Sequence, residues 1–278
     1  MPIHDQGYRR YEGRRTPHGR AWWVIGRTQL RAALRSRRFI ALLLFAWSPF
    51  VVRAVQIYAS SNFQQVALLA ATARTFRDFL DQQSFFVFLV TIAMAGSIAD
   101  DRRANALQLY LSKPLTRVEY IVGRLVPMLI CLLGVTLVPA VLLLALQIAF
   151  SGSTTFLQQN LFLLPAITLA SILQALLSAF AMLALSSLSK SRRFVSVMYA
   201  GIIFFTAALY QALGSITGSR VWAVLSPGDM LDVVADAAFR VRAQPPVPLS
   251  VAVVVIVALI AASIWVLERR VRAVEIVA

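Results

Sequence analysis

The chain has 278 residues, of which 59% are hydrophobic and only 14% are charged. Soluble domains carry about 45–50% apolar and about 25% charged residues, so the composition excludes an ordinary soluble enzyme and a disordered chain. A single cysteine, Cys131, excludes an internal disulfide framework and a multi-thiolate metal site.

The first 38 residues are basic and precede the first apolar run. Residues 1–20 are polar and Arg-rich, and we expect a flexible cytoplasmic leader without a cleavable signal peptide. Residues 21–38 mix apolar and basic positions, which predicts an amphipathic helix in the membrane interface. A solvated basic leader is the alternative, although tryptophan favours the interface. The interfacial residues are Trp22, Trp23, Arg27 and Arg31.

Six apolar runs follow along the chain. A helix needs about 20 apolar residues to cross a bilayer core of about 30 Å. The runs are apolar on all sides, as expected for helices buried in lipid or in a bundle. The sequence therefore predicts an all-α, polytopic membrane protein whose transmembrane domain covers residues 39–267. The six predicted spans are residues 39–58, 84–99, 125–150, 161–188, 194–213 and 249–267.

The 27 Lys and Arg residues fall unevenly between these spans. Alternate segments, beginning with the N-terminal one, carry ten, five, three and three of them, whereas the intervening segments carry two, none and three. Basic residues concentrate in cytoplasmic loops, so we expect both termini to be cytoplasmic, including the tail at 268–278. The net charge of +15 then faces anionic lipid headgroups, and nucleic acid is not an expected partner.

Two segments on the predicted outer side have recognisable patterns. Residues 66–80 mix apolar and charged positions, which indicates a short surface helix between the first two spans. Residues 214–248 contain two apolar stretches, 221–225 and 230–239, on either side of a Ser-Pro-Gly-Asp turn. We expect this second segment to form a re-entrant hairpin of two short helices.

Motifs for catalysis and metal binding are missing from the sequence. Both histidines, His4 and His18, precede the first span, and no zinc-protease, serine-hydrolase or phosphate-loop motif occurs. We therefore expect no catalytic residue, metal or cofactor in this chain. The predicted spans contain no Asp or Glu, so a proton relay is not expected. Arg53 and Gln174 are candidates for a pathway or subunit contact, and simple snorkelling or helix packing is the alternative.

Residues 100–124, on the predicted cytoplasmic side, carry the most distinctive pattern. An apolar stretch ends at Pro114, and Thr116 begins a second helix with Glu119 placed to complete a capping box. Leucines and a tyrosine on such a loop often bury against a partner. The segment is predicted to be a helix, a break and a helix that project from the membrane, and a plain solvated connection is the alternative.

This segment resembles the loop between the second and third spans in permease subunits of ABC-2 type ABC transporters. The matching features are an acidic residue at 100 or 101, three leucines, a Ser-x-Pro-Leu-Thr-Arg element at 112–117 and a Gly-Arg-Leu element at 123–125. An interfacial helix followed by six spans is also similar to that family.

The resemblance implies a transport subunit without its own nucleotide-binding site, working as part of an exporter in the bacterial cytoplasmic (inner) membrane. The loop would be the coupling helix that docks on a separate cytoplasmic ATPase, present in two copies, which would bind ATP and Mg²⁺. A second copy of this permease, or a homologous permease, would complete the pathway. The residues assigned to ATPase coupling are Asp101, Arg102, Arg103, Leu107, Tyr110, Leu111, Pro114, Arg117 and Glu119.

Two other classes of function stay open at this point. An ATP-independent secondary transporter or channel is disfavoured by the missing acids in the spans and by the lack of an obvious repeat with broken helices. The third class is a noncatalytic membrane assembly protein. The substrate is left open, because lipids, amphiphilic drugs, peptides and glycolipids all suit a pathway with few charges.

Overall fold

The computed structural model describes residues 21–62, 72–104, 116–151, 158, 160–241 and 247–271. Every regular element within these ranges is a helix, which confirms the all-α prediction. The helices are α1 (Ala21–Arg35), α2 (Arg37–Ala46), α3 (Ser48–Asn62), α4 (Ala73–Ala93), α5 (Gly96–Arg103), α7 (Arg117–Val135), α8 (Leu137–Ser151), α10 (Leu163–Leu188), α11 (Arg192–Thr217), η2 (Arg220–Leu225), α12 (Pro227–Ala238) and α13 (Leu249–Arg270).

Six stretches of the described chain are long and apolar enough to cross a membrane, as predicted. The first three stretches each contain two helices: α2 with α3, α4 with α5, and α7 with α8. The last three are the single helices α10, α11 and α13. The chain is therefore a multi-pass membrane protein.

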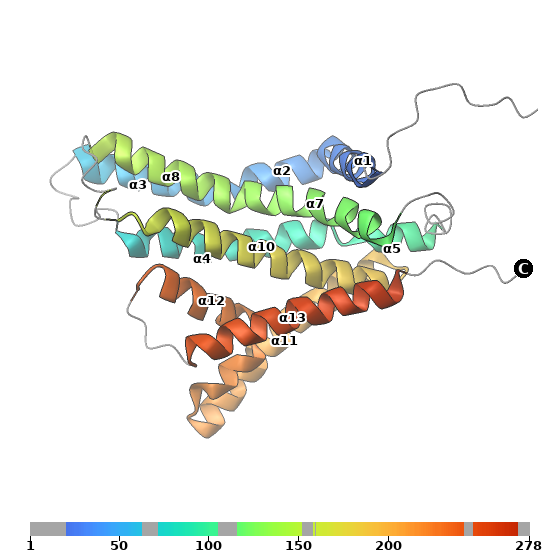
Figure 1. The fold of residues 1–278 in the computed structure, drawn as a ribbon. Helices are drawn as coiled ribbons and strands as arrows, with labels where there is room; N and C mark the ends of the chain where they lie inside the picture. The colour runs from blue at the N-terminus through green and yellow to red at the C-terminus, as the bar shows by residue number, and fades with distance from the viewer. Residues whose placement is uncertain are drawn as a thin grey trace, which may run out of the picture.

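Helix α10 lies at the centre of the bundle. It contacts α4, α7 and α13, and also α5, α8, α11 and α12. Figure 1 shows α10 between α7 and α8 on one side and α12 and α13 on the other. Its small residues Ser171, Ala175 and Ala179 are fully buried, so neighbouring helices can approach it closely. Helix α10 is therefore the element against which helices on both of its sides pack directly.

The first and third spans break close to prolines. Helices α2 and α3 separate at Trp47, two residues before Pro49, and α7 and α8 separate at Thr136, three residues before Pro139. A proline has no N–H for the carbonyl four residues earlier, and its ring clashes with that carbonyl. Pro127 instead lies inside the continuous helix α7.

The second span differs from its predicted boundaries. Helix α4 begins at Ala73, so the separate surface helix expected at 66–80 is wrong for its described part, while residues 63–71 lie outside the described residues. Helix α4 therefore contains Asp78 and Asp81, which precede the predicted span at residues 84–99. The charged residues before position 84 were interpreted as part of a segment outside the span. Hydropathy does not reveal the oppositely charged side chains with which such residues pair.

The second span is also divided by a break. Besides the two proline breaks, α4 ends at Ala93 and α5 begins at Gly96. No proline lies near this third break. The break is fixed by contacts with α10 that are described below, so it has no local signal in the sequence.

Helix α1 is present where the interfacial helix was predicted, but it ends at Arg35. Ser36 then caps the start of α2, accepting a hydrogen bond from the backbone N–H of Phe39. In Figure 1, α1 crosses one end of α7, near α5. We call this end of the bundle the α5 end.

Gly123 allows α1 to cross α7 at close range. A Cβ atom built at Gly123 would lie 2.9 Å from the carbonyl oxygen of Trp22 and 3.0 Å from the Cβ atom of Ile25. A Cβ atom built at Gly26 would lie 3.3 Å from the carbonyl oxygen of Gly123. The two glycines thus bring the backbones of the two helices together.

We expect Gly123→Ala to push α1 away from α7, because the nearest atom is backbone and cannot rotate aside. The expected cost is about 1–3 kcal/mol, seen as a lower midpoint of thermal unfolding in detergent. Gly134→Ala on the same helix is the control, since a Cβ atom there meets nothing within 4 Å. Equal midpoints for the two variants would contradict the close crossing.

Candidate coupling site and membrane cavity

Ser186 of α10 joins α5 to the centre of the bundle. Its hydroxyl accepts hydrogen bonds from the backbone N–H groups of Ile98 (3.1 Å) and Ala99 (2.9 Å) and donates to the carbonyl of Ala95 (2.8 Å). The first N–H groups of a helix have no partner within the helix. Ser186, itself fully buried, supplies that partner at the break between α4 and α5.

Asp101 joins α5 to α7 and α1. Its carboxylate accepts a hydrogen bond from the hydroxyl of Tyr120 (2.6 Å) and forms an ion pair with the guanidinium of Arg124. Arg124 also donates to the side chain of Gln29 on α1 (3.3 Å), and Gln29 donates to Ser97 on α5 (3.2 Å). This network links three helices, and bonds of this kind between charged groups are roughly twice as strong as neutral ones.

Two further arginines bridge the same break. Arg102 of α5 donates to the carbonyl of Ser187, at the end of α10. Arg192, the first residue of α11, donates to the carbonyl of Ala93, the last residue of α4. Helix α5 is thus held from α1, α7 and α10, and the end of α4 is held from α11.

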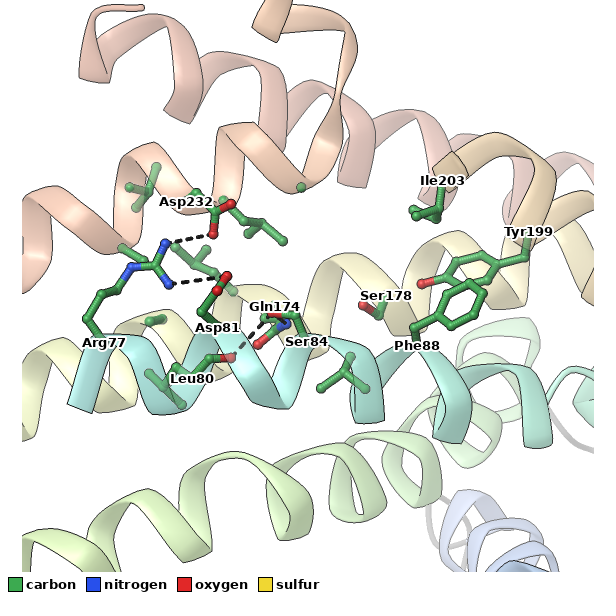
Figure 2. Close-up of a pocket in the computed structure, with 17 residues that line it drawn as sticks. Arg77, Leu80, Asp81, Ser84, Phe88, Gln174, Ser178, Tyr199, Ile203 and Asp232 are labelled. Atoms are coloured by element: carbon green, nitrogen blue, oxygen red, sulfur yellow. Dashed lines mark hydrogen bonds and ion pairs between the residues drawn. The ribbon is translucent and has the colours of Figure 1, made fainter. Parts of the chain in front are cut away.

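A cavity of about 170 Å³ lies between α4, α10, α11 and α12 (Figure 2). One end is charged, with Arg77, Asp81 and Asp232 in its wall. Figure 2 shows the hydrogen bond between Gln174 and Ser84 (2.7 Å) in the middle and the rings of Phe88 and Tyr199 at the other end. The rings stack with their centroids 5.9 Å apart.

The charged end of the cavity centres on Arg77, whose side chain is only 10% exposed. Its Nη2 lies 2.7 Å from Oδ1 of Asp232, and its Nε lies 2.6 Å from Oδ1 of Asp236. Asp81 follows at 3.9 Å. Partial burial raises the pKa of Asp232 to about 6, Arg77 opposes this shift, and the neighbouring Asp81 and Asp229 add to it. One cation thus holds α12 against α4.

This cluster was missed in the sequence because its members come from two distant segments. The available signal was the spacing of Asp232 and Asp236, which lie four residues apart and share one face of a helix. Such a face, next to a membrane, requires a cationic partner. The sequence alone does not say which arginine supplies it.

A family model described as ABC-2 family transporter protein matches residues 23–271 of this chain. The chain belongs to the ABC-2 transporter family. Comparison with curated proteins gives no match. As an ABC-2 permease, the chain is the membrane subunit of an ABC transporter, and subunits of this family generally lack an ATPase site of their own.

The structure describes part of the segment that was assigned to ATPase coupling in this ABC-2 permease. Asp101 and Arg102 make contacts inside the chain, whereas Arg103 and Arg117 are exposed. Glu119 completes the predicted capping box: its backbone N–H donates to the hydroxyl of Thr116 (3.2 Å), and its Oε2 accepts from the backbone N–H of Thr116 (3.0 Å). The residues outside the described ranges are Leu107, Tyr110, Leu111 and Pro114.

The remaining candidate residues of the permease are spread over the bundle. Trp22 and Trp23 make an edge-to-face pair on α1, with centroids 5.9 Å apart. Arg53 donates to Gln56 one turn further along α3 (2.9 Å) and is not among the residues that line the cavity described above. Gln174 does line that cavity. Arg27 and Arg31 are exposed on α1.

Two short helices occupy the stretches expected to be helical between α11 and α13. Helix η2 covers Arg220–Leu225, and α12 begins at Pro227 after the capping residue Ser226. Ser226 accepts a hydrogen bond from the backbone N–H of Asp229 (3.4 Å), as its place in the predicted turn requires. Residues 242–246, which contain most of the Pro-rich lead into the last span, lie outside the described residues.

Proposed function

We propose that this ABC-2 permease is the membrane subunit of an ATP-driven exporter and that residues 100–124 receive the motion of a separate cytoplasmic ATPase. The observation that carries this proposal is the attachment of α5 to α1, α7 and α10 through Ser186, Asp101 and Arg102. Through these contacts, a displacement of the segment that follows α5 would reach the adjacent ends of α1, α7 and α10.

The proposed mechanism follows from these attachments. Two ATPase subunits approach each other when they bind ATP and Mg²⁺, and each displaces the coupling segment docked on it. Helix α5 follows as a rigid body and moves the adjacent ends of α7 and α10. Because α10 also lines the cavity beside α12, its tilt changes access to the Arg77 end. A second permease, identical or homologous, would supply the other half of the pathway.

The topology proposed here places the α5 end in the cytoplasm of a bacterial cell, at the inner membrane. The Lys and Arg bias supports this orientation. The direction of transport is proposed from the family resemblance. ATP and Mg²⁺ are assigned to the partner ATPase, since the sequence of the permease contains no phosphate-loop motif.

We expect Leu111→Glu to abolish co-purification with an ATPase encoded in the neighbouring reading frame, because a charge would be buried where an apolar contact is needed. Ile216→Glu is the control, because it also replaces an apolar side chain with Glu. Ile216 is 80% exposed and lies near the C-terminal end of α11, away from the α5 end. Both variants should elute as single species in detergent. Normal capture of the ATPase by Leu111→Glu would refute the coupling role.

A further inference from the structure

A second hollow, at the α5 end, has a different chemistry from the cavity beside α12. This groove of about 750 Å³ is lined by parts of α1, α2, α5, α7 and α11 and by the break that ends α4. Ligand pockets typically have volumes of about 300–1,000 Å³. The groove is therefore large enough to bind the head and the first part of the chain of an amphiphile.

The groove lies where helices enter the membrane. Two of the candidate spans begin at Arg37 and Arg192, and the groove is lined by Arg38 and by Arg192 itself. Residues 21–62 contain no acidic residue at all. Arginines at the mouth of a span lie at the depth of lipid headgroups. The position and the charge therefore match the headgroup layer of the adjacent leaflet.

Three arginines line the groove and differ in how many of their hydrogen-bond donors are already paired. Arg38 is exposed, and no partner of its guanidinium is found within the described residues. Arg192 donates one hydrogen bond to the carbonyl of Ala93. Because a guanidinium has five N–H donors, others remain for a ligand. Arg124 is paired with Asp101, yet its buried Nε finds no acceptor in the described part of the chain. These donors are available to oxygen acceptors from outside the chain.

Two carboxylates also line the groove and restrict where an anion fits. Asp101 is already bound to Arg124 and Tyr120. Asp100 and the stem of Arg192 both lie against Gly96, where the missing side chain leaves room for them. The carboxylates disfavour an anion beside α5 itself and leave two cationic partners for it: Arg38, next to the N-terminus of α2, and the guanidinium of Arg192 on α11. Helix N-termini favour negative charge.

Part of the groove lining is apolar. Phe39, Leu42, Ala93 and Met94 contribute to its lining. Because α2 begins a candidate span, this apolar wall leads from the headgroup layer toward the membrane core. The groove thus has cationic donors at its mouth and an apolar surface beside them. These two features are complementary to an amphiphile with an anionic headgroup.

We propose that this groove binds an anionic phospholipid of the surrounding bilayer, with its phosphate on Arg38 and Arg192 and an acyl chain against Phe39 and Leu42. Two segments outside the described residues, 1–20 and 105–115, are disfavoured as occupants because their net charge is positive. Residues 1–20 carry five Arg and two acidic residues, and the only charge in residues 105–115 is Lys113. Like charge would keep both segments out of an arginine-lined groove.

The lipid would have a mechanical consequence. Its phosphate would bridge the start of α2 and the start of α11, which flank the break between α4 and α5. Anionic lipid would therefore stiffen the α5 end against the rest of the bundle. This role goes beyond ATPase coupling, and its test needs no ATPase.

The test is the retention of lipid by the full-length chain in a zwitterionic detergent, counted by native mass spectrometry during titration with phosphatidylglycerol or phosphatidylcholine. We expect one tightly held phosphatidylglycerol per chain and a clear preference over phosphatidylcholine. Arg38→Gln combined with Arg192→Gln should weaken phosphatidylglycerol binding about tenfold or more. The corresponding double substitution to Lys should keep the preference, because the charge is kept.

The matched control is Arg37→Gln combined with Arg193→Gln. These exposed arginines are the immediate neighbours of the two proposed ligands, carry the same charge and do not line the groove. Their loss should change phosphatidylglycerol binding by no more than about twofold. Arg38→Gln alone, which removes no hydrogen bond or ion pair within the described residues, provides a variant that should keep the fold and still weaken binding.

Three results would overturn the proposal. Equal weakening by the two double variants would show a general attraction between a basic surface and anionic lipid. Equal retention of phosphatidylglycerol and phosphatidylcholine would remove the charge requirement. Displacement of the lipid by millimolar inorganic phosphate would show a site for free anions, in which the apolar wall has no part.

Discussion

Ser186→Ala is expected to loosen the attachment of α5 to α10. The substitution leaves the N–H groups of Ile98 and Ala99 without their buried acceptor and removes the donor to the carbonyl of Ala95. An unsatisfied buried group costs about 1–3 kcal/mol, so the variant should lose about 2–4 kcal/mol of stability. Backbone amides of α5 should then exchange with deuterium about tenfold faster or more.

Ser187→Ala is the matched control for this prediction. Ser187 is the next residue and equally buried, but its hydroxyl donates only to the carbonyl of Ala184 within the same helix. Exchange in α5 should be almost unchanged in this variant. If both variants, or neither, accelerate exchange at Ile98 and Ala99, then Ser186 does not hold the break in the second span.

Arg77→Ala is expected to release α12 from α4. The variant leaves Asp232 and Asp236 facing each other without their shared cation, in a partly buried position. Removing one partner of a buried ion pair costs about 3–5 kcal/mol, and because both carboxylates are partly exposed we expect about 2–3 kcal/mol here. The measurement is the midpoint of thermal unfolding of the purified chain in detergent.

Arg74→Ala is the control for the Arg77 variant, because Arg74 lies three residues earlier on α4 and is exposed. Its loss should change the midpoint little. A second check combines Arg77→Met with Asp232→Asn and Asp236→Asn, which removes the unpaired charges and should recover part of the lost stability. An Arg77 variant as stable as the Arg74 variant would show that the cluster does not hold α12.

The features that could be predicted from the sequence are local ones. Each of the six spans is visible as an apolar stretch of the sequence. A membrane-spanning segment must form its backbone hydrogen bonds within itself and present apolar side chains to lipid. The capping box at Thr116 and Glu119 needs only residues three positions apart. The proline breaks near Pro49 and Pro139 likewise follow from the missing N–H of a single residue.

The features that could not be predicted depend on residues far apart in the chain. The start of α4 extends through charged residues because Arg77 meets Asp236, 159 residues later. The break before α5 is stabilised by Ser186, 88 residues after Ile98. Asp101 was assigned to ATPase coupling, and its partners within the chain, Tyr120 and Arg124, lie 19 and 23 residues later. The residue type alone does not show whether an aspartate is buried in contacts within the chain or exposed to a partner.

The central claim is that α5 moves as one body with the end of α10 when the partner ATPase binds ATP. Distances between spin labels measure this directly in the permease–ATPase complex, with Cys131→Ala as background. Labels at Arg103 and Leu188 report α5 against α10, and labels at Arg103 and Val221 report α5 against η2; all three side chains are exposed. On trapping with ATP and vanadate, the first distance should stay constant while the second changes by several ångströms. A change in the first distance with no change in the second would contradict the account.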